Sequence, residues 1–351
     1  MIDRPMTIEN ASCSVEETVS PGNGTFFGKA ARMAANNIVV VTLAILIAGI
    51  IYAVASVADW LFGTRLKRAF IAWIQGVSRD RLNVLRKAQI RHVFKRYFHL
   101  KKIRIRLAGG SYWLSIPCIV TGVERGTHNP KKYLAKIVSD RSVIKHRYMT
   151  TLRNLGVLAD GSSLKFLEYE NARDMACFEI DNLKKLREQG VHVPDAYGLY
   201  RLGGEDYMLV MEFIEGKPLS GVALDRDLMV QVFGTLRAMH DSGMFHGDVK
   251  LDNFMVSGGQ VVVFDSLRID SGERNQAQAF DLSSAICALS QKASVSMVLE
   301  EARRHYSDRE IEAAGAIIDV ALAKVDLELP PNKIEELKRA LSGYSSPVLA
   351  T

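Results

Sequence analysis

The chain has 351 residues, of which 48% are hydrophobic, and a formal net charge of +6. This length and hydrophobic fraction allow two or three domains with buried cores and exclude a disordered protein. The four cysteines have no paired spacing (Cys13, Cys118, Cys177 and Cys287). The sequence therefore predicts neither a zinc site nor a disulfide framework, and it suits a reducing compartment.

The N-terminal region contains a polar tail and then a long apolar run. Residues 1–36 have no sustained apolar period, which predicts a flexible tail. Residues 38–58 carry no charge over about the twenty residues that a bilayer-spanning helix requires, and Trp60 and Phe62 add interfacial aromatic rings. We interpret residues 37–62 as a transmembrane helix. The alternatives are a buried core helix and a cleaved signal peptide, which normally begins with its short basic region.

Positive charge is concentrated directly after this apolar run. Residues 63–106 contain fourteen Lys and Arg and one acid, Asp80, which gives this segment a net charge of +13. Because basic flanks of a span remain in the cytoplasm, residues 63–351 are expected there, with residues 1–36 across the membrane. The sequence thus predicts a single-pass protein of the cell membrane. Charge confined to one juxtamembrane segment also argues against a specific nucleic-acid partner.

The end of this basic segment has a helical pattern. Residues 79–98 place apolar side chains at near-helical spacing with basic residues between them. We assign residues 63–100 to a juxtamembrane segment whose amphipathic helix contacts anionic lipid headgroups. The alternative is a solvated helix that only links the span to the next domain.

The pattern from residue 101 to residue 351 predicts an α+β domain. Short β runs come first, at residues 103–107, 112–123 and 132–138. A helix over residues 172–189 and a buried strand from Tyr207 follow. The later helices are expected at residues 226–242, from Asp281, after a capping box at Ser307 to Glu310, and after Pro331.

The window over residues 245–267 combines a predicted hairpin with three polar side chains. Two apolar runs, residues 254–256 and 261–264, flank a Ser-Gly-Gly-Gln turn and predict a β-hairpin. Asp248 and Asn253 precede the hairpin and Asp265 follows it, so the three side chains should converge. Such oxygen ligands suit a hard cation such as Mg²⁺. A polar turn before a hairpin is the alternative, but a turn requires only one or two of these residues.

This window resembles the catalytic and metal-binding loops of the protein-kinase-like superfamily. It reads His246-Gly247-Asp248-Val249-Lys250-Leu251-Asp252-Asn253, and Asp265-Ser266-Leu267 follows the hairpin. The resemblance implies that Asp248 orients the attacking hydroxyl or accepts its proton, while Lys250 neutralises charge on the γ-phosphate of ATP. It also implies that Asn253 and Asp265 hold Mg²⁺. The implied fold is bilobal, with a small β-rich lobe over residues 101–211 and a helical lobe over residues 217–351.

The resemblance implies further contacts with ATP. Lys136 would contact the phosphates, with Glu179 as its carboxylate partner and Glu170 and Glu168 as alternatives. The glycines Gly109 and Gly110 would let backbone amides approach the phosphates, although a Gly-Gly pair is also a common hairpin turn.

One further segment and one further aspartate complete the implied site. Backbone groups of Glu212, Phe213 and Ile214 would bind the adenine. Asp281 would cap its helix, bind the backbone of the catalytic loop, or do both.

The window also departs from ordinary protein kinases. Gly247 replaces the arginine that would pair with a phosphorylated activation loop, Ser266-Leu267 replaces Phe-Gly, and only fifteen residues separate Asp265 from Asp281. These features are similar to the compact atypical kinases of the RIO, lipopolysaccharide-kinase and aminoglycoside-phosphotransferase types.

We therefore expect a membrane-anchored, ATP- and Mg²⁺-dependent kinase that phosphorylates a hydroxyl. Lys250 favours a serine or threonine of a protein as the acceptor, since protein Ser/Thr kinases carry this lysine. A lipid, glycolipid or small-molecule hydroxyl is the alternative acceptor. A nucleotide-binding pseudokinase or scaffold is the alternative of a different class.

Overall fold

A computed structural model describes most of the chain from residue 84 onward. The described residues are Ile50, Ile51, Val54, Leu82, 84–108, 115–159, 164–203, 206–270, 274–322, 327 and 329–342. The predicted tail and nearly all of the apolar run over residues 38–58 lie outside them. Within the described part, no helix combines the length and the apolar character needed to cross a bilayer.

The structure has the predicted α+β composition and divides into two compact units. The first unit comprises residues up to 148, 169–177 and 197–211, and the second comprises residues 149–168, 178–196 and 212–351. Two helices, α5 (Asp140–Ala159) and α6 (Ala172–Glu188), begin in the first unit and end in the second.

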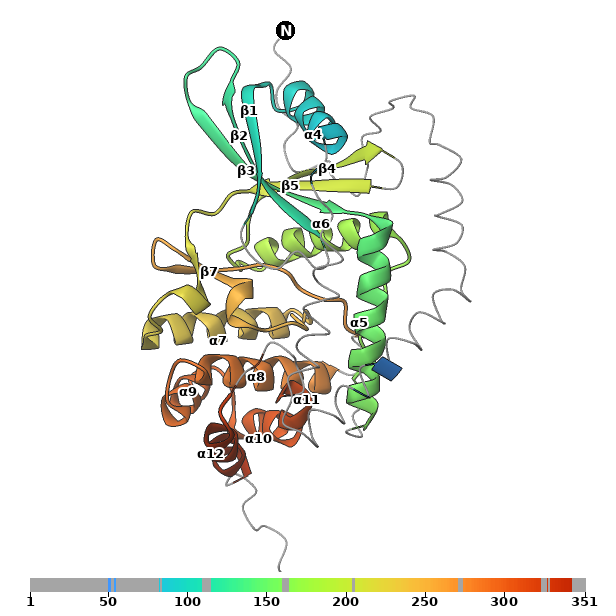
Figure 1. Ribbon diagram of the computed structural model, residues 1–351. Helices are drawn as coiled ribbons and strands as arrows, with labels where there is room; N and C mark the ends of the chain where they lie inside the picture. The colour runs from blue at the N-terminus through green and yellow to red at the C-terminus, as the bar shows by residue number, and fades with distance from the viewer. Residues whose placement is uncertain are drawn as a thin grey trace, which may run out of the picture. The chain divides into compact units, whose positions relative to one another are not determined.

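The first unit is built on a five-stranded sheet with the order β1-β2-β3-β5-β4 (Figure 1). Its strands are β1 (Leu100–Leu107), β2 (Ile116–Glu124), β3 (Pro130–Val138), β4 (Ala196–Gly203) and β5 (Asp206–Glu212). The pairs β1 with β2 and β2 with β3 are antiparallel. Each of the three predicted β runs corresponds to a strand, and the buried strand from Tyr207 corresponds to β5.

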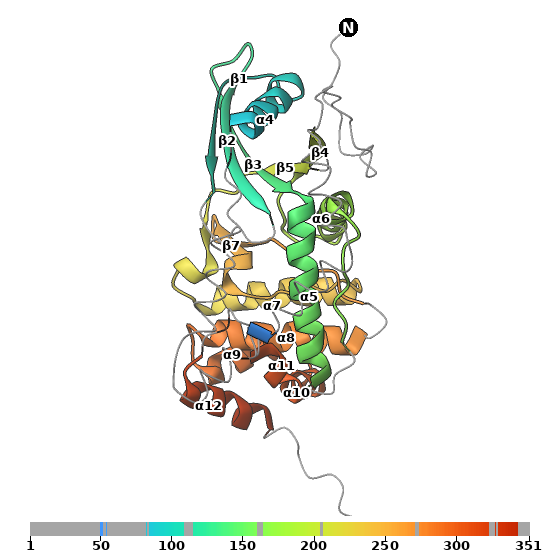
Figure 2. The same ribbon diagram turned by 45° about the vertical axis from the view of Figure 1, so that its right-hand side comes forward.

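The helix α4 (Val84–Arg96) packs against this sheet (Figure 2). Its Ile90, Val93 and Phe94 are buried in one apolar core with side chains from all five strands. The guanidinium of Arg86 also pairs with the carboxylate of Asp206 on β5. This apolar face is therefore buried against the sheet, and the predicted contact of the basic side chains with anionic lipid headgroups stays a prediction.

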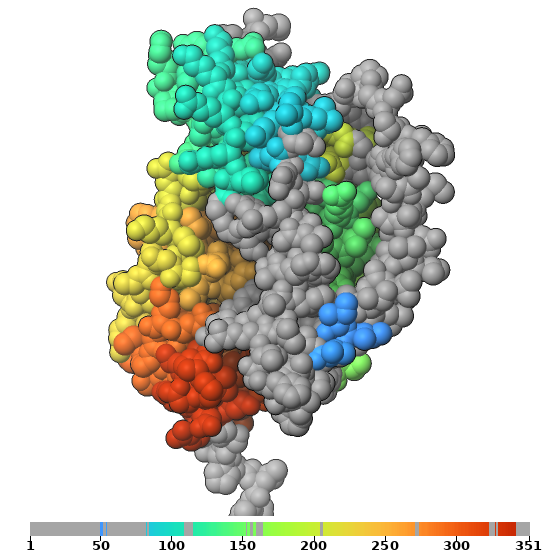
Figure 3. Space-filling view, viewed as in Figure 1, coloured from blue at the N-terminus to red at the C-terminus, as the bar shows by residue number. Residues whose placement is uncertain are grey.

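Basic side chains cover the outer surface of the same region. Figure 3 shows α4 and β1 side by side at the surface of the first unit. The exposed cations there are Lys95, Arg96, Lys101, Lys102, Arg104 and Arg106. The exposed surface of this region thus combines these cations with a few apolar side chains, Val84, Leu85 and Leu107.

The second unit consists of a small sheet and a set of helices. The sheet has the order β6-β7-β8, with strands β6 (Lys217–Pro218), β7 (Phe254–Ser257) and β8 (Gln260–Val263). Two short 3₁₀ turns, η2 (Leu219–Gly221) and η3 (Leu251–Asn253), precede α7 and β7. The helices are α7 (Arg226–Asp241), α8 (Arg274–Ser290), α9 (Val295–Ala302), α10 (Asp308–Ala316), α11 (Ile318–Leu322) and α12 (Pro331–Ser342).

The central element of the second unit is α8, which packs against α7, α9, α10 and α11 (Figure 1). It is buried along most of its length. The capping box was predicted correctly: Ser307 and Glu310 satisfy each other's backbone N–H groups at the start of α10. This packing matters for the site because α8 carries Asp281.

The cysteines differ in part from the sequence expectation. Cys118 and Cys287 are buried free thiols. Burial raises the pKa of Cys118 to about 12, so this thiol is inert as a nucleophile at neutral pH. Cys177 is disulfide-bonded. The spacing of the cysteines in the sequence did not predict this bond, because disulfide pairing depends on proximity in the fold.

Candidate active site

The predicted hairpin is present and brings the two ends of the motif together. The strands β7 and β8 pair from Phe254 opposite Val263 to Ser257 opposite Gln260. Gly258 and Gly259 have φ values of 56° and 80°, as a two-residue hairpin turn of type I′ requires. The backbone N–H of Phe264 then donates to the carbonyl of Asn253 at 2.9 Å. Asp265 is thereby held next to Asn253.

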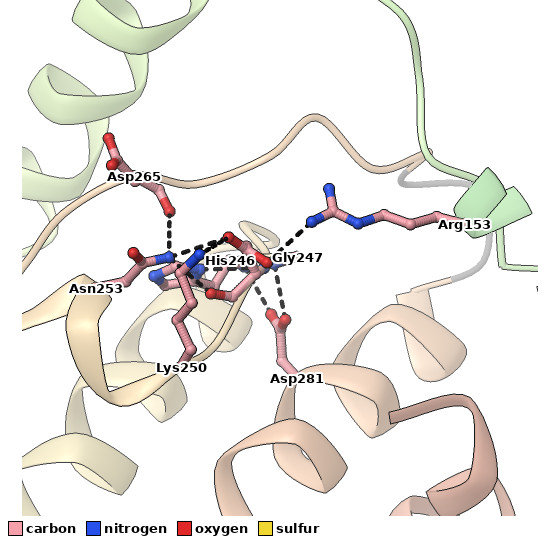
Figure 4. A network of polar contacts seen from close by, with 8 residues as sticks. Arg153, His246, Gly247, Lys250, Asn253, Asp265 and Asp281 are labelled. Carbon is pink, nitrogen blue, oxygen red and sulfur yellow. Dashed lines mark hydrogen bonds and ion pairs between the residues drawn. The ribbon is translucent and has the colours of Figure 1, made fainter. Parts of the chain in front are cut away.

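The side-chain amide of Asn253 joins the three predicted residues. Its Nδ2 donates to the backbone carbonyl of Asp248 at 2.8 Å and to Asp248 Oδ2 at 3.2 Å. It also lies 3.5 Å from the backbone carbonyl of Asp265 (Figure 4). The expected convergence is therefore confirmed for the side chains of Asp248 and Asn253, whereas Asp265 joins them through its backbone carbonyl. Since Nδ2 faces these acceptors, the amide oxygen of Asn253 faces away from them.

Two cations contact the carboxylate of Asp248, whose residue is only 8% exposed. Lys250 Nζ lies 3.2 Å from Oδ2, on the same carboxylate oxygen that Asn253 contacts. Arg153 Nη2 donates to the other oxygen, Oδ1, at 3.2 Å. Figure 4 shows Arg153 and Asn253 on opposite sides of Gly247. The two cations therefore balance the negative charge of a buried carboxylate.

Asp281 holds the backbone of the catalytic loop by hydrogen bonds. The carboxylate of Asp281 is fully buried and accepts hydrogen bonds from the backbone N–H groups of His246 at 2.6 Å and Gly247 at 2.8 Å. Its predicted contact with the loop is therefore confirmed. The prediction that Asp281 caps its helix was wrong, because α8 begins seven positions earlier, at Arg274. The apolar residues before Asp281 extend the buried helix toward its N-terminus.

Two further polar contacts connect Asp281 to His240 and, through His240, to Tyr306. His240 Nε2 lies 3.3 Å from Asp281 Oδ2, and His240 Nδ1 lies 2.9 Å from the hydroxyl of Tyr306. Burial raises the pKa of Tyr306, with the nearby Asp281 charge as a further cause, so the phenol stays protonated and donates to Nδ1. His240 then donates from Nε2 to Asp281. The loop therefore rests on a fully buried polar network.

Asp265 has the backbone geometry of a constrained residue. Its φ is 50°, in the left-handed region that is uncommon for residues other than glycine. The following residues explain how this conformation is held. Asn182 donates to the hydroxyl of Ser266, and the N–H of Leu267 donates to the carbonyl of His246 at 2.8 Å. Asp265 itself is exposed, so its carboxylate faces outward.

The donor set at this site fits Mg²⁺. Asp265 offers a carboxylate and Asn253 an amide oxygen, and Mg²⁺ is usually held by one or two such groups together with waters and substrate phosphates. Among the described residues, no cluster of three or more His, Cys, Asp or Glu side chains is placed to hold a metal ion. The site therefore resembles a shared metal and phosphate site and differs from an all-protein metal cage.

The other predicted nucleotide contacts remain predictions. Lys136 is buried in β3, in the first unit, and Glu179 lies on the part of α6 that belongs to the second unit. Gly109 and Gly110 lie outside the described residues. Glu168 and Glu170 precede α6.

The predicted adenine-binding segment follows β5 directly. Glu212, Phe213 and Ile214 are half-buried. The N–H of Glu212 already donates to the carbonyl of Asp195 at 2.7 Å, and the N–H of Asp195 donates back to Glu212 Oε2 at 3.2 Å. A contact with adenine would therefore use the carbonyl of Glu212 or the backbone of the two residues after it.

Sequence reasoning missed α5 and its Arg153. The segment between the strand of Lys136 and the helix of Glu179 received no prediction, although residues 140–159 contain no proline and Ser139 precedes them as a possible N-cap. These features could have identified the helix. No local signal could have identified Arg153, because its partner Asp248 is 95 positions away.

Comparisons with known proteins agree with the kinase-like assignment. Residues 161–282 match the RIO domain family. This match includes the catalytic loop, the hairpin, Asp265 and Asp281. It ends before the C-terminal helices and begins after Lys136.

Two curated relatives match shorter segments. A probable bifunctional tRNA threonylcarbamoyladenosine biosynthesis protein of Methanothermobacter thermautotrophicus is 29% identical over 83 residues, which are 24% of this chain and 15% of that protein. The KEOPS complex subunit Bud32 of Pyrococcus abyssi is 27% identical over 106 residues, 28% of this chain and 47% of that protein. The chain thus spans less than half the length of each relative.

Among solved structures, the PknI kinase domain of Mycobacterium tuberculosis covers 70% of this chain and 97% of its own, at 12% identity and a TM-score of 0.31. A second variant of the same domain gives a TM-score of 0.33 at 13% identity. The RIO match and the geometry of the catalytic loop together support an atypical kinase of the protein-kinase-like superfamily. They support a phosphotransferase that binds ATP, without specifying its acceptor.

Proposed function

We propose that this protein is an ATP- and Mg²⁺-dependent phosphotransferase that transfers the γ-phosphate of ATP to an alcohol hydroxyl. The observation that carries the proposal is the amide of Asn253, which joins the carboxylate of Asp248 to the backbone of Asp265. A merely structural turn has no need of a charged carboxylate with two cationic partners next to an outward-facing aspartate.

The residues of the chain have distinct roles in this proposal. Asp248 orients the acceptor hydroxyl and takes its proton, and Lys250 holds that carboxylate while placing positive charge toward the γ-phosphate. Asn253 and Asp265 turn oxygens toward Mg²⁺, which neutralises phosphate charge when it is bound. Asp281 keeps the loop in the conformation that aligns these groups.

The remaining predicted contacts with ATP belong to the same proposal. Lys136 contacts the phosphates and Glu179 positions this lysine. Backbone groups of Gly109 and Gly110 approach the phosphates, and the segment from Glu212 to Ile214 receives the adenine.

The acceptor is proposed as an alcohol, with two candidates favoured by different observations. Lys250 favours a serine or threonine of a protein, as in the Ser/Thr kinases. A compact small-molecule or lipid alcohol is favoured by the pairing of residues 165–167 with residues 268–270, which occupies the chain after Asp265. A pseudokinase would retain nucleotide binding without transfer to either acceptor.

ATP consumption by the wild-type protein and by two variants tests this proposal. Asp248→Asn should keep Mg-ATP binding, seen as a thermal shift, while turnover falls by roughly 10²-fold or more, because the residue acts on the acceptor. Asp265→Ala should lose both the Mg-ATP shift and turnover, because a charged metal ligand is removed. The opposite pattern of binding in the two variants would show that the roles are wrongly assigned. Wild-type binding without turnover would favour the pseudokinase.

We also propose a membrane location. Residues 38–58 would anchor the chain, with residues 63–351 in the cytoplasm and the exposed cations of α4 and β1 facing anionic lipids. Such charge contacts are screened over about 8 Å at physiological ionic strength, so they should weaken as salt rises. Protease added outside intact cells should leave residues 63–351 uncut. Digestion of that region from outside would contradict the topology.

A further inference from the structure

The end of α5 and residues 164–168 belong to the second unit, where Arg153 of α5 contacts Asp248 of the catalytic loop. Asn154, on α5, holds the backbone of Phe166 from both sides: its Nδ2 donates to the carbonyl at 2.9 Å and its Oδ1 accepts from the N–H at 2.8 Å. Phe166 in turn forms an isolated antiparallel bridge with Ile269. The end of α5 is therefore tied to the segment that follows Asp265.

Main-chain hydrogen bonds extend this pairing in both directions. The N–H of Leu167 donates to the carbonyl of Arg268 at 2.9 Å, and the N–H of Asp270 donates to the carbonyl of Lys165 at 2.9 Å. A peptide that docked by adding a strand to this edge would have to displace the chain's own residues. The paired edge therefore favours a compact acceptor over an extended peptide.

The side chain of Arg153 lies at the junction of this segment and Asp248. Its guanidinium is 5.8 Å from the ring centroid of Phe166, and Nη2 donates to Asp248 Oδ1 at 3.2 Å. The aromatic face and the ion pair fix the planar group while its side chain remains 23% exposed. Arg153 contacts Oδ1 of Asp248, whereas Asn253 and Lys250 contact the other oxygen, Oδ2.

The guanidinium of Arg153 has N–H donors that remain available to a ligand. Of its five N–H donors, those on Nη2 serve Asp248, and no hydrogen bond from Nε or Nη1 to another described residue is present. A guanidinium offers donors in a fork that matches a phosphate or carboxylate. An anion held there would stand next to Asp248, on the side of Oδ1.

We propose that Arg153 is a specificity-determining residue that binds an anionic group of the acceptor, and that the acceptor is a compact alcohol carrying a phosphate near its hydroxyl. This inference rests on the proposed phosphotransferase function and names its substrate class. Arg153 holds the anion with its remaining donors, and Asp248 meets the neighbouring hydroxyl. The hydroxyl oxygen forms a bond to the γ-phosphorus as the bond to the ADP oxygen breaks, and the hydroxyl proton passes to Asp248.

The test compares a charged acceptor with its neutral counterpart in the full-length protein. Transfer from ATP to sn-glycerol 3-phosphate and to glycerol is measured for the wild type, Arg153→Gln and Arg153→Lys. In the wild type, kcat/KM should favour the phosphorylated acceptor. Arg153→Gln should reduce this preference by about tenfold or more, mainly through the acceptor KM, since a charged hydrogen bond contributes about 1.5–3 kcal/mol. Arg153→Lys should lose part of this preference for the phosphorylated acceptor.

The matched control is Arg303→Gln, which removes an exposed arginine that pairs with Asp308 in the same unit. It should leave the preference unchanged. An equal loss for both acceptors after Arg153→Gln would overturn the inference, because Arg153 would then act only through Asp248. A wild-type enzyme without preference for the charged acceptor would overturn it as well.

Two further arms identify the source of the phosphate and separate this inference from the proposed function. Transfer to phosphatidylglycerol vesicles in preference to soluble glycerol 3-phosphate would identify a lipid headgroup, whereas better transfer to a serine peptide flanked by glutamates would overturn the inference.

Calorimetric binding of glycerol 3-phosphate without ATP gives an independent readout. Binding weakened by Arg153→Gln in a protein without ATP turnover would support the anion site and refute the phosphotransferase. Equal binding by both proteins would overturn the anion site itself.

Discussion

The buried carboxylate of Asp281 accepts a hydrogen bond from the backbone N–H of Gly247 at 2.8 Å, although the two residues belong to different elements of the second unit. The same carboxylate accepts the N–H of His246 at 2.6 Å. Asp281 thus sets the conformation of the loop that carries Asp248, without contacting Asp248. A change at Asp281 should therefore affect both stability and turnover.

We expect Asp281→Asn to destabilise the protein by about 1–3 kcal/mol, because an amide NH₂ group would face backbone donors and leave one of them unsatisfied. Turnover should also fall, with Mg-ATP affinity changed less. Thermal unfolding and ATP consumption measure the two effects. Asp319→Asn is the control, since Asp319 is exposed on α11 and pairs with Lys338. Unchanged unfolding in Asp281→Asn would show that the hydrogen bonds contribute little.

Gly247 is required for two separable reasons. Its φ is 72°, and a Cβ atom there would lie 2.9 Å from Ile269 Cδ1. Gly247→Ala should cost about 1–2 kcal/mol for the left-handed conformation and about 1–3 kcal/mol more for the crowding. Gly126→Ala isolates the first cost, because Gly126 has a φ of 87° and open space around it. Denaturant unfolding of the two variants should differ by the crowding cost, and equal losses would contradict the close approach.

The hairpin and the convergence of Asp248, Asn253 and Asp265 could be predicted from the sequence because their signals are local. A Gly-Gly turn between two short apolar runs fixes the register, and the register determines which residues meet at the end. The contact of Asp281 with the loop came from the family resemblance, whereas its assignment as an N-cap relied on composition and was wrong.

Other features could not be predicted because they depend on tertiary contacts. The periodicity of residues 79–98 indicates that one helical face is buried, but it does not distinguish a membrane from a sheet as the partner. The structure buries Phe94 against the sheet. The contact of Arg153 with Asp248 likewise depends on how α5 folds back beside the catalytic loop.

The proposed pairing of Lys136 with Glu179 remains a prediction and can be tested by a double-mutant cycle. Lys136→Met should lower kcat/KM for ATP strongly, and Glu179→Gln should lower it less, because the carboxylate only positions the lysine. The double variant should be no worse than Lys136→Met alone, since members of one ion pair are not additive. Fully additive losses would exclude Glu179 as the partner. Glu188→Gln is the matched control, as an exposed acid at the end of the same helix.

The capping box of α10 should make part of the stability depend on pH. Burial alone would raise the pKa of Glu310, but hydrogen bonds from Ser307 and Gln278 and the charge of Arg237 outweigh it and lower this pKa to about 2. A carboxyl group whose pKa is depressed in the folded state stabilises the protein above its unfolded pKa of about 4.3. That stabilisation is lost as the pH falls from there toward 2.

Ser307→Ala tests this dependence. The change removes a 2.8 Å hydrogen bond from Ser307 Oγ to Glu310 Oε2 and the acceptor for the N–H of Glu310. It should cost about 1 kcal/mol at pH 7, and the cost should shrink as the pH is lowered from 5 to 3, measured by urea unfolding. Ser294→Ala is the matched control, because Ser294 caps α9 through the N–H of Met297 and has no carboxylate at that position. The cost of Ser294→Ala should not change with pH over this range, and a parallel decline in both variants would exclude Glu310 as the titrating group.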